Sequence, residues 1–115
     1  LEGFEVVCAV PLAVTPDRAG ALAAFQGDLA RYLALPFYRA MLERAGFAAE
    51  IREFDRGGTV PGALAEALGG LGDASVGGAY VKAYRDAGVT LPAVRPVLFP
   101  DAPWYAGTLE AAATW

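Results

Sequence analysis

The chain has 115 residues, of which 56% are hydrophobic and only 19% are charged, and its net charge is −4. This length fits one domain with a modest core, and the apolar excess indicates either a large buried interface or a part of a larger structure. The 9 basic and 13 acidic residues form no basic cluster, which argues against nucleic-acid binding, and no run reaches the ~18 apolar residues of a membrane span.

The cysteine and histidine content limits the chemistry further. Cys8 is the single cysteine, so no intrachain disulfide forms, and a reducing, cytoplasmic setting is expected. The chain has no histidine, which removes the commonest general base and the commonest zinc ligand. No Cys or His cluster indicates a metal, and the first residues have no basic region typical of a secretory signal.

The first predicted element is a strand over Phe4 to Val14, FEVVCAVPLAV, which is apolar on both alternating faces. Such a pattern is typical of a strand in a parallel sheet that helices cover on both sides. Pro11 lacks an N–H group, so we expect an edge position or a local bulge there. Cys8, in the middle of this strand, is expected to be a buried and inert thiol.

Helical segments follow the strand. Thr15-Pro16-Asp17 predicts a helix start, and the helix is expected to reach about Leu33, with Leu22, Phe25, Leu29 and Tyr32 on one apolar face. A second helix is expected from Phe37 to Ala45, ended by Gly46, with Phe37, Met41 and Leu42 directed inward. Two shorter helical pieces are expected over Phe47 to Phe54 and over Pro61 to Leu68. The acidic residues of these helices, Asp28, Glu43, Glu50 and Glu53, are expected to be solvated.

The last third begins with Gly69 to Gly72, which we predict to be the most flexible stretch or a hinge. A helix capped by Asp73 or Ser75 is expected to end at Gly88, with Val76, Tyr80, Tyr84 and Ala87 buried. A strand follows in Val89 to Phe99, regular from about Ala93, and a Pro-rich turn leads to a terminal helix over Trp104 to Ala113 with Leu109 inward. No Gly-rich segment is predicted to follow a strand and open a helix, so no phosphate-loop pattern is met.

This order predicts an α/β fold in which two parallel strands are separated by several helices and followed by a terminal helix. Two strands do not form a stable sheet alone, and their open edges would expose unpaired backbone groups. We therefore expect additional strands from a second copy or from another polypeptide.

Three segments carry a resemblance to a known family. They are FEVVCAVPLAVTPDRAGALAAF with the following LARYLALPFYRAMLERAGF, then GDASVGGAYVKAYRDAGVTLPAVRPV, and finally FPDAPWYAGTLEAAA. Together they resemble the C-terminal part of the bacterial-luciferase-like flavin- or deazaflavin-dependent monooxygenases. The resemblance implies a TIM (β/α)₈ barrel of roughly 250 residues, of which this chain would supply only the C-terminal portion. The whole chain, residues 1–115, is then a single domain or a fragment of one.

The resemblance also implies a cofactor, FMN or a deazaflavin, and a cytoplasmic enzyme completed by another copy or by the remaining part of the same enzyme. Active sites of such barrels lie at the carboxyl ends of the strands, here Val14 to Asp17 and Phe99 to Tyr105. Arg95, Phe99 and Asp101 are the candidate cofactor- or substrate-binding residues. Catalytic residues are not identified, because most pocket residues of the family lie outside these segments.

Each candidate has a structural alternative. Arg95 either binds an anionic group or forms an ion pair with an acidic residue, and Asp101 either orients a hydroxyl group or makes a turn. Trp104 and Tyr105 either form a wall for a ring-shaped ligand or serve as packing anchors. Two functions stay open: part of a luciferase-like oxidoreductase that is inactive as an isolated chain, and a non-catalytic α/β module that oligomerises through apolar surface.

Overall fold

The computed structural model of the protein describes residues 5–98 and 101–115. Its elements are, in chain order, β1 (Val7–Val14), α1 (Arg18–Tyr32), α2 (Pro36–Leu42), the π-helical turn η1 (Glu43–Phe47), α3 (Ala48–Gly57), α4 (Gly62–Leu68), β2 (Gly70–Gly72), α5 (Ala74–Asp86), β3 (Leu91–Pro96) and α6 (Tyr105–Ala112). The predicted α/β class is confirmed. Phe4 and Phe99, the first residue of one predicted strand and the last of the other, lie outside the described residues.

The sheet contains a third strand that the sequence did not predict. Gly70–Gly72, expected to be a flexible hinge, is the buried strand β2, which pairs parallel to β1 with Leu12 opposite Gly70. Because Gly70 has no side chain, its backbone approaches Leu12 and Tyr80 too closely for any larger residue. The expected flexibility is therefore wrong, since pairing with a strand distant in sequence holds this segment in extended form.

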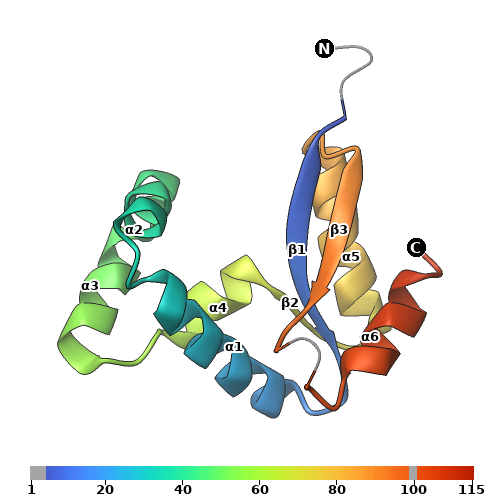
Figure 1. Cartoon of the computed structure of the whole chain (residues 1–115), viewed down its shortest axis with the longest axis horizontal. Coiled ribbons are helices and arrows are strands. Elements are labelled where there is room, and N and C mark those ends of the chain that lie inside the picture. Colours follow the sequence, from blue (N-terminus) through green and yellow to red (C-terminus); the bar gives the residue numbers. More distant parts are fainter. Residues whose placement is uncertain (1–4, 99–100) are drawn as a thin grey trace.

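All strands of the described sheet are parallel, in the order β2-β1-β3. The first strand is thus central, as in doubly wound sheets, whereas barrel strands are neighbours in chain order. In Figure 1, α5 lies behind β1 and β3, while α2 and α3 stand away from the sheet and are joined to it through α1 and α4.

Pro11 occupies the central strand and not the predicted edge or bulge. The carbonyls of Val6 and Leu12 accept hydrogen bonds from Leu91 and Val97, so alternate residues of β1 direct their backbone groups toward the β3 side. The nitrogen of Pro11 therefore faces the β2 side, where pairing begins only at Leu12. The missing N–H group costs no ladder bond, because β1 has no strand neighbour at that point in the described sheet.

The two faces of the sheet are covered to different extents. On one face Val10 and Leu12 pack with Val81 of α5, and on the other Ala13 and Val97 join the larger core with Phe25 of α1 and Leu64 of α4. The second face is covered only at the carboxyl ends of its strands. Toward their amino ends it exposes apolar side chains from both strands, namely Val7, Ala9, Leu91 and Ala93.

The apolar stripe of α1 is as predicted, since Phe25 and Leu29 are buried. Other inward assignments are wrong. Phe37 and Met41 of α2 are exposed, because this helix does not pack against the sheet and joins the larger core through Leu42. Val76 of α5, Ala87 at the C-cap of this helix and Leu109 of α6 are also exposed. The buried positions of the two helices are Gly77, Val81 and Thr108.

The helix ends follow local chemistry. Asp17, and not Thr15, caps α1, because its carboxylate accepts a hydrogen bond from the Gly20 N–H at 3.0 Å. Asp73 caps α5 as predicted. Gly46 interrupts the chain between α2 and α3 with φ 102°, a conformation that favours glycine and explains the predicted break there.

Candidate functional site

Two of the residues that the sequence singled out come together at the carboxyl end of β3. Arg95 and Asp101 line one polar cavity of about 260 Å³, with Asp28 and Arg31 of α1 and with Leu98. Leu98 has a left-handed backbone (φ 55°), and its carbonyl accepts a hydrogen bond from the Asp101 N–H at 3.0 Å, which closes a turn. Phe99, the third candidate, lies outside the described residues.

Arg95 is held between an acid and an aromatic ring. Its Nη2 atom lies 3.6 Å from the Asp28 Oδ2 atom, and its guanidinium carbon lies 5.5 Å from the centroid of the Tyr32 ring. The ion-pair interpretation of Arg95 is therefore confirmed. The separation is nevertheless too long for a hydrogen bond, and the Arg95 side chain is 45% exposed, so the guanidinium stays accessible.

Asp28 is the acid that the sequence placed wrongly on a solvated surface. Its side chain is only 5% exposed, and it accepts a hydrogen bond from Arg31 in addition to the contact with Arg95. A carboxylate removed from water in this way needs nearby positive charge. The side of α1 that bears Asp28 faces the carboxyl end of β3, a relation that neither segment reveals alone.

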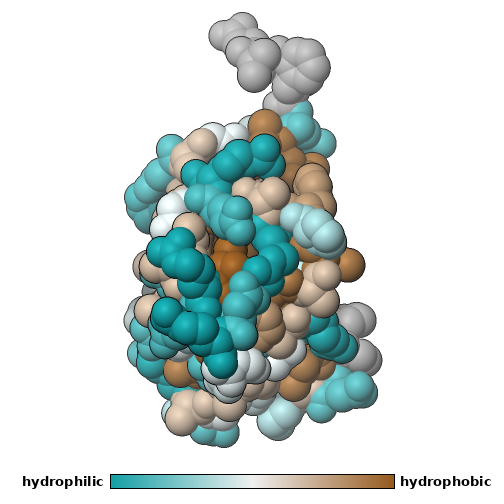
Figure 2. Space-filling view, turned by 90° about the vertical axis from the view of Figure 1, so that its left-hand side faces the viewer, coloured by the Kyte–Doolittle hydropathy of each residue, from teal (hydrophilic) through white to brown (hydrophobic). Residues whose placement is uncertain are grey.

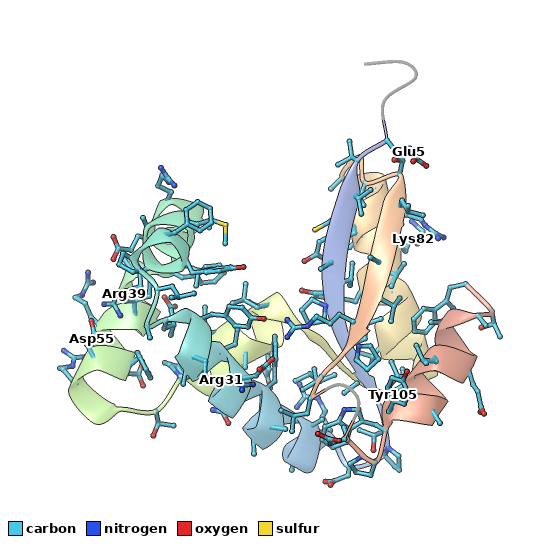
Figure 3. The ribbon with its side chains drawn as sticks, in the orientation of Figure 1. Glu5, Arg31, Arg39, Asp55, Lys82 and Tyr105 are labelled. Carbon is cyan, nitrogen blue, oxygen red and sulfur yellow. The ribbon has the colours of Figure 1, made fainter. Side chains whose placement is uncertain are left out.

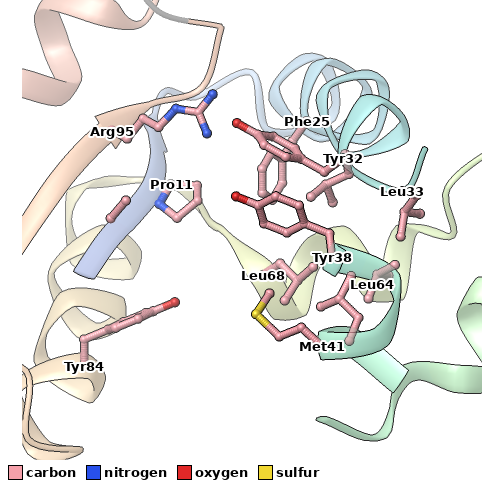
Figure 4. Close-up of a pocket in the computed structure, with 13 residues that line it drawn as sticks. Pro11, Phe25, Tyr32, Leu33, Tyr38, Met41, Leu64, Leu68, Tyr84 and Arg95 are labelled. Carbon is pink, nitrogen blue, oxygen red and sulfur yellow. The ribbon is translucent and has the colours of Figure 1, made fainter. Parts of the chain in front are cut away.

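A second cavity, of about 230 Å³, lies on the other side of Arg95. It lies beside the part of β1 before Leu12, which has no strand neighbour on its β2 side in the described sheet. Figure 4 shows side chains converging on it from β1, α1, α2, α4 and α5. Its aromatic lining residues are Phe25, Tyr32, Tyr38 and Tyr84. The Tyr32 and Tyr38 rings lie 5.0 Å apart, brought together by the short turn between α1 and α2. Sequence reasoning missed this cavity because its walls come from six separate elements, β3 with Arg95 included.

The remaining candidates have structural roles. Trp104 is buried, and its indole N–H donates a hydrogen bond to the Val97 carbonyl at 2.8 Å, so the packing-anchor interpretation is confirmed for it. Tyr105 is half-buried at the start of α6. Cys8 is half-buried, not fully buried as predicted, and its thiol faces the carbonyl of Ala9 at 3.6 Å.

The start of α5 resembles a phosphate site in chain order but not in chemistry. The glycine-containing segment is itself strand β2, which leads into α5, and no glycine-rich loop follows this strand in the described chain. The Asp73 carboxylate already occupies the amino end of α5, because it accepts hydrogen bonds from the Val76 N–H and the Ser75 hydroxyl. These bonds, that from Ser75 above all, lower the pKa of Asp73 below its ordinary value. A second anion at this helix end would meet a negative charge.

One charged pair lies away from both cavities and joins two helices. Figure 3 shows Arg39 and Asp55 close together on α2 and α3. Two hydrogen bonds, of 3.0 and 2.5 Å, join them, and the bond from Arg39 holds the pKa of Asp55 below its ordinary value. This pair links the two helices of a segment that makes little contact with the sheet.

Within the described part of the chain, no group of three or more His, Cys, Asp or Glu side chains is placed to hold a metal ion. None of the helices in residues 5–98 and 101–115 combines the length and the apolarity needed to cross a bilayer. Comparison of the chain with protein-family models, with curated proteins and with solved structures gave no match.

Proposed function

We propose that this chain is the C-terminal part of a luciferase-like oxidoreductase that uses reduced FMN or a deazaflavin, and that it is inactive until other strands complete it. The proposal depends on the difference between the two faces of the sheet. Helix α5 covers one face, and the opposite face exposes the apolar residues Val7, Ala9, Leu91 and Ala93. The interior of a (β/α)₈ barrel requires such a face, since side chains of other strands fill it. The resemblance of three segments to this family supports the same assignment.

The cofactor would meet this chain at the polar cavity. Arg95 and Asp101 lie at the carboxyl end of a parallel strand, where barrel enzymes place their sites. The Arg95 guanidinium fits a carbonyl or anionic edge of a flavin ring, and the Asp101 carboxylate can accept a hydrogen bond from a ring N–H or a hydroxyl group. The bound cofactor would supply hydride transfer or oxygen activation, while these side chains orient it.

The described residues could contact only part of the cofactor, so the remaining contacts require further strands. The α5 start is blocked by Asp73, and the α1 start by Asp17, so neither helix end in the described chain offers a phosphate site. Contacts to a cofactor phosphate would therefore come from the completing strands or from the start of α6, which no side chain caps. The strand order β2-β1-β3 differs from that of a (β/α)₈ barrel, whose strands are neighbours in chain order, so the support comes from the uncovered face and not from the order of the strands.

Titration of the purified chain with reduced FMN and with a reduced deazaflavin tests the cofactor assignment. We expect weak, saturable binding, about tenfold weaker in Arg95→Gln, because a hydrogen bond to a charged group contributes about 1.5 kcal/mol or more. Arg85→Gln, on the exposed surface of α5, is the matched control and should bind as the original chain does. Absence of saturable binding to the folded chain, or equal binding by both variants, contradicts the assignment.

The uncovered sheet face favours a second candidate, a non-catalytic module that oligomerises through apolar surface. Figure 2 shows that the side of the molecule bearing α2 and α3 is mostly polar and that apolar surface gathers near the start of β1. Val6 and Val7 of this region are 44% and 60% exposed. Light scattering after size exclusion separates the candidates: a defined oligomer without flavin binding supports the module, and a stable monomer that binds no flavin contradicts both.

A further inference from the structure

The apolar cavity beside β1 has one charged wall. Among the described residues that line it, Arg95 is the charged one, and the others are aromatic, aliphatic or proline side chains. Small-molecule sites have this composition, a largely apolar lining with few polar groups that fix orientation. We propose that this cavity binds a small aromatic carboxylate, whose ring lies among the aromatic side chains and whose carboxylate meets Arg95.

Arg95 has the donors that such a carboxylate needs. No hydrogen bond joins its guanidinium to another side chain or backbone group of the described residues, and its nearest acidic atom, Oδ2 of Asp28, is 3.6 Å away. The Tyr32 ring holds the guanidinium from a second direction. A planar guanidinium fixed in this way and accessible on its cavity side can form two parallel hydrogen bonds with one carboxylate.

The aromatic walls select the body of the ligand. Phe25 is buried beneath the cavity, and Tyr38 and Tyr84 approach from α2 and α5 on opposite sides of it. Ring faces and edges at these positions favour a flat aromatic group over an alkyl chain, because aromatic pairs gain energy beyond the area that they bury. Figure 4 also shows the hydroxyl groups of Tyr32 and Tyr38 on the side of the cavity nearer to Arg95 and Pro11. A carboxylate at Arg95 would therefore lie in the more polar corner.

The size of the cavity limits the ligand. Its volume of about 230 Å³ equals roughly eight water-sized groups at about 30 Å³ each. Benzoate and its hydroxylated relatives are of this size, whereas a nucleotide or a long acyl chain exceeds it. Met41 at the rim is a flexible side chain and can adjust to ring substituents.

Charge selectivity tests the proposal. Benzoate and its neutral isostere benzamide are titrated separately into the purified chain by calorimetry, without any flavin. We expect benzoate to bind about tenfold more tightly than benzamide, and Arg95→Gln to abolish this preference by weakening benzoate alone. Arg95→Lys keeps the charge but not the planar pair of donors, so its preference should be intermediate. Arg85→Gln, on the outer surface of α5, should leave both affinities unchanged.

Tyr38→Ala separates the ring contact from the charge contact. Since this change removes one aromatic wall and no charge, both ligands should bind more weakly by a similar factor. Far-UV circular dichroism of each variant checks that it is folded. Three outcomes would overturn the proposal: equal affinities for benzoate and benzamide, no saturable binding of either by the folded chain, or a preference retained in Arg95→Gln. Because flavin is absent, these outcomes are independent of the oxidoreductase assignment.

Discussion

Replacement of Gly70 by alanine decides whether β2 is a packed strand or a flexible connection. A Cβ atom at this position would lie 2.5 Å from the Leu12 Cδ2 atom and 2.9 Å from the Tyr80 Cβ atom. Carbon atoms normally approach to about 3.5 to 4.0 Å, so both contacts are too short by roughly 0.6 Å or more. Leu12 can change rotamer, but the Tyr80 Cβ atom is fixed to the α5 backbone. Either β2 or α5 must therefore move.

Insertion of a methyl group into a packed core of this kind costs about 1 to 3 kcal/mol of unfolding free energy. For a domain of this size the midpoint of thermal unfolding should fall by roughly 4 to 12 °C. Urea unfolding followed by circular dichroism measures the free energy directly. In a flexible connection the same substitution would stabilise the fold by about 0.4 to 1 kcal/mol, because alanine reduces the entropy of the unfolded chain.

Gly27→Ala is the matched control for this experiment. Gly27 lies in the middle of α1 and is exposed, and a Cβ atom at this position would meet nothing within 4 Å beyond its chain neighbours and its own helix backbone. Alanine there should stabilise the chain by about 0.5 to 1 kcal/mol through helix propensity. If Gly70→Ala were as stable as Gly27→Ala, the assignment of Gly70–Gly72 as a buried strand would be refuted.

Two further changes test contacts at the ends of the strands and helices. Thr108→Val should lower the unfolding free energy by about 1 to 3 kcal/mol, because the buried Thr108 hydroxyl accepts a hydrogen bond from the Val14 N–H at 2.9 Å and valine leaves this N–H unpaired. The control Thr114→Val, at an exposed position, should change the unfolding free energy by less than about 0.5 kcal/mol. Asp73→Ala should lower the unfolding free energy most above about pH 5. The difference in unfolding free energy between the original chain and this variant should shrink as the pH falls below 3.8, the ordinary pKa of the carboxyl group, because the pKa of Asp73 is lowered in the folded state. Urea unfolding at several pH values measures this difference, and one that stays constant down to acid pH would contradict the role of the Asp73 carboxylate.

Part of the candidate site could be predicted from the sequence. The position of Arg95 near the end of an apolar strand, with Asp101 in the following turn, sufficed to place both at one edge of the sheet. The sequence did not indicate their neighbours, because Asp28 looks like any acidic residue on a helix. Its burial depends on the packing of α1 against the end of β3, which lies more than sixty residues away along the chain.

The aromatic cavity illustrates the same limit. Phe25 follows the apolar period of α1 and was correctly predicted to be inward, but Tyr38 and Tyr84 have no periodic relation to it. Their meeting depends on the turn that directs α2 away from the sheet and on the uncovered edge of β1. Such a cavity is a property of how elements are spaced, and no local pattern encodes spacing.

The amino-acid sequence alone determined the α/β class, the two longer strands and most helix ends, because apolar period, capping carboxylates and helix-ending glycines act over a few residues. Only the tertiary structure decided that Gly70–Gly72 is a strand and that β1 lies between β2 and β3. A segment of two glycines and one leucine has no strand preference of its own. Hydrogen bonds to β1 and the close approach of Leu12 and Tyr80 impose the extended form, and these contacts exist only once the chain has folded.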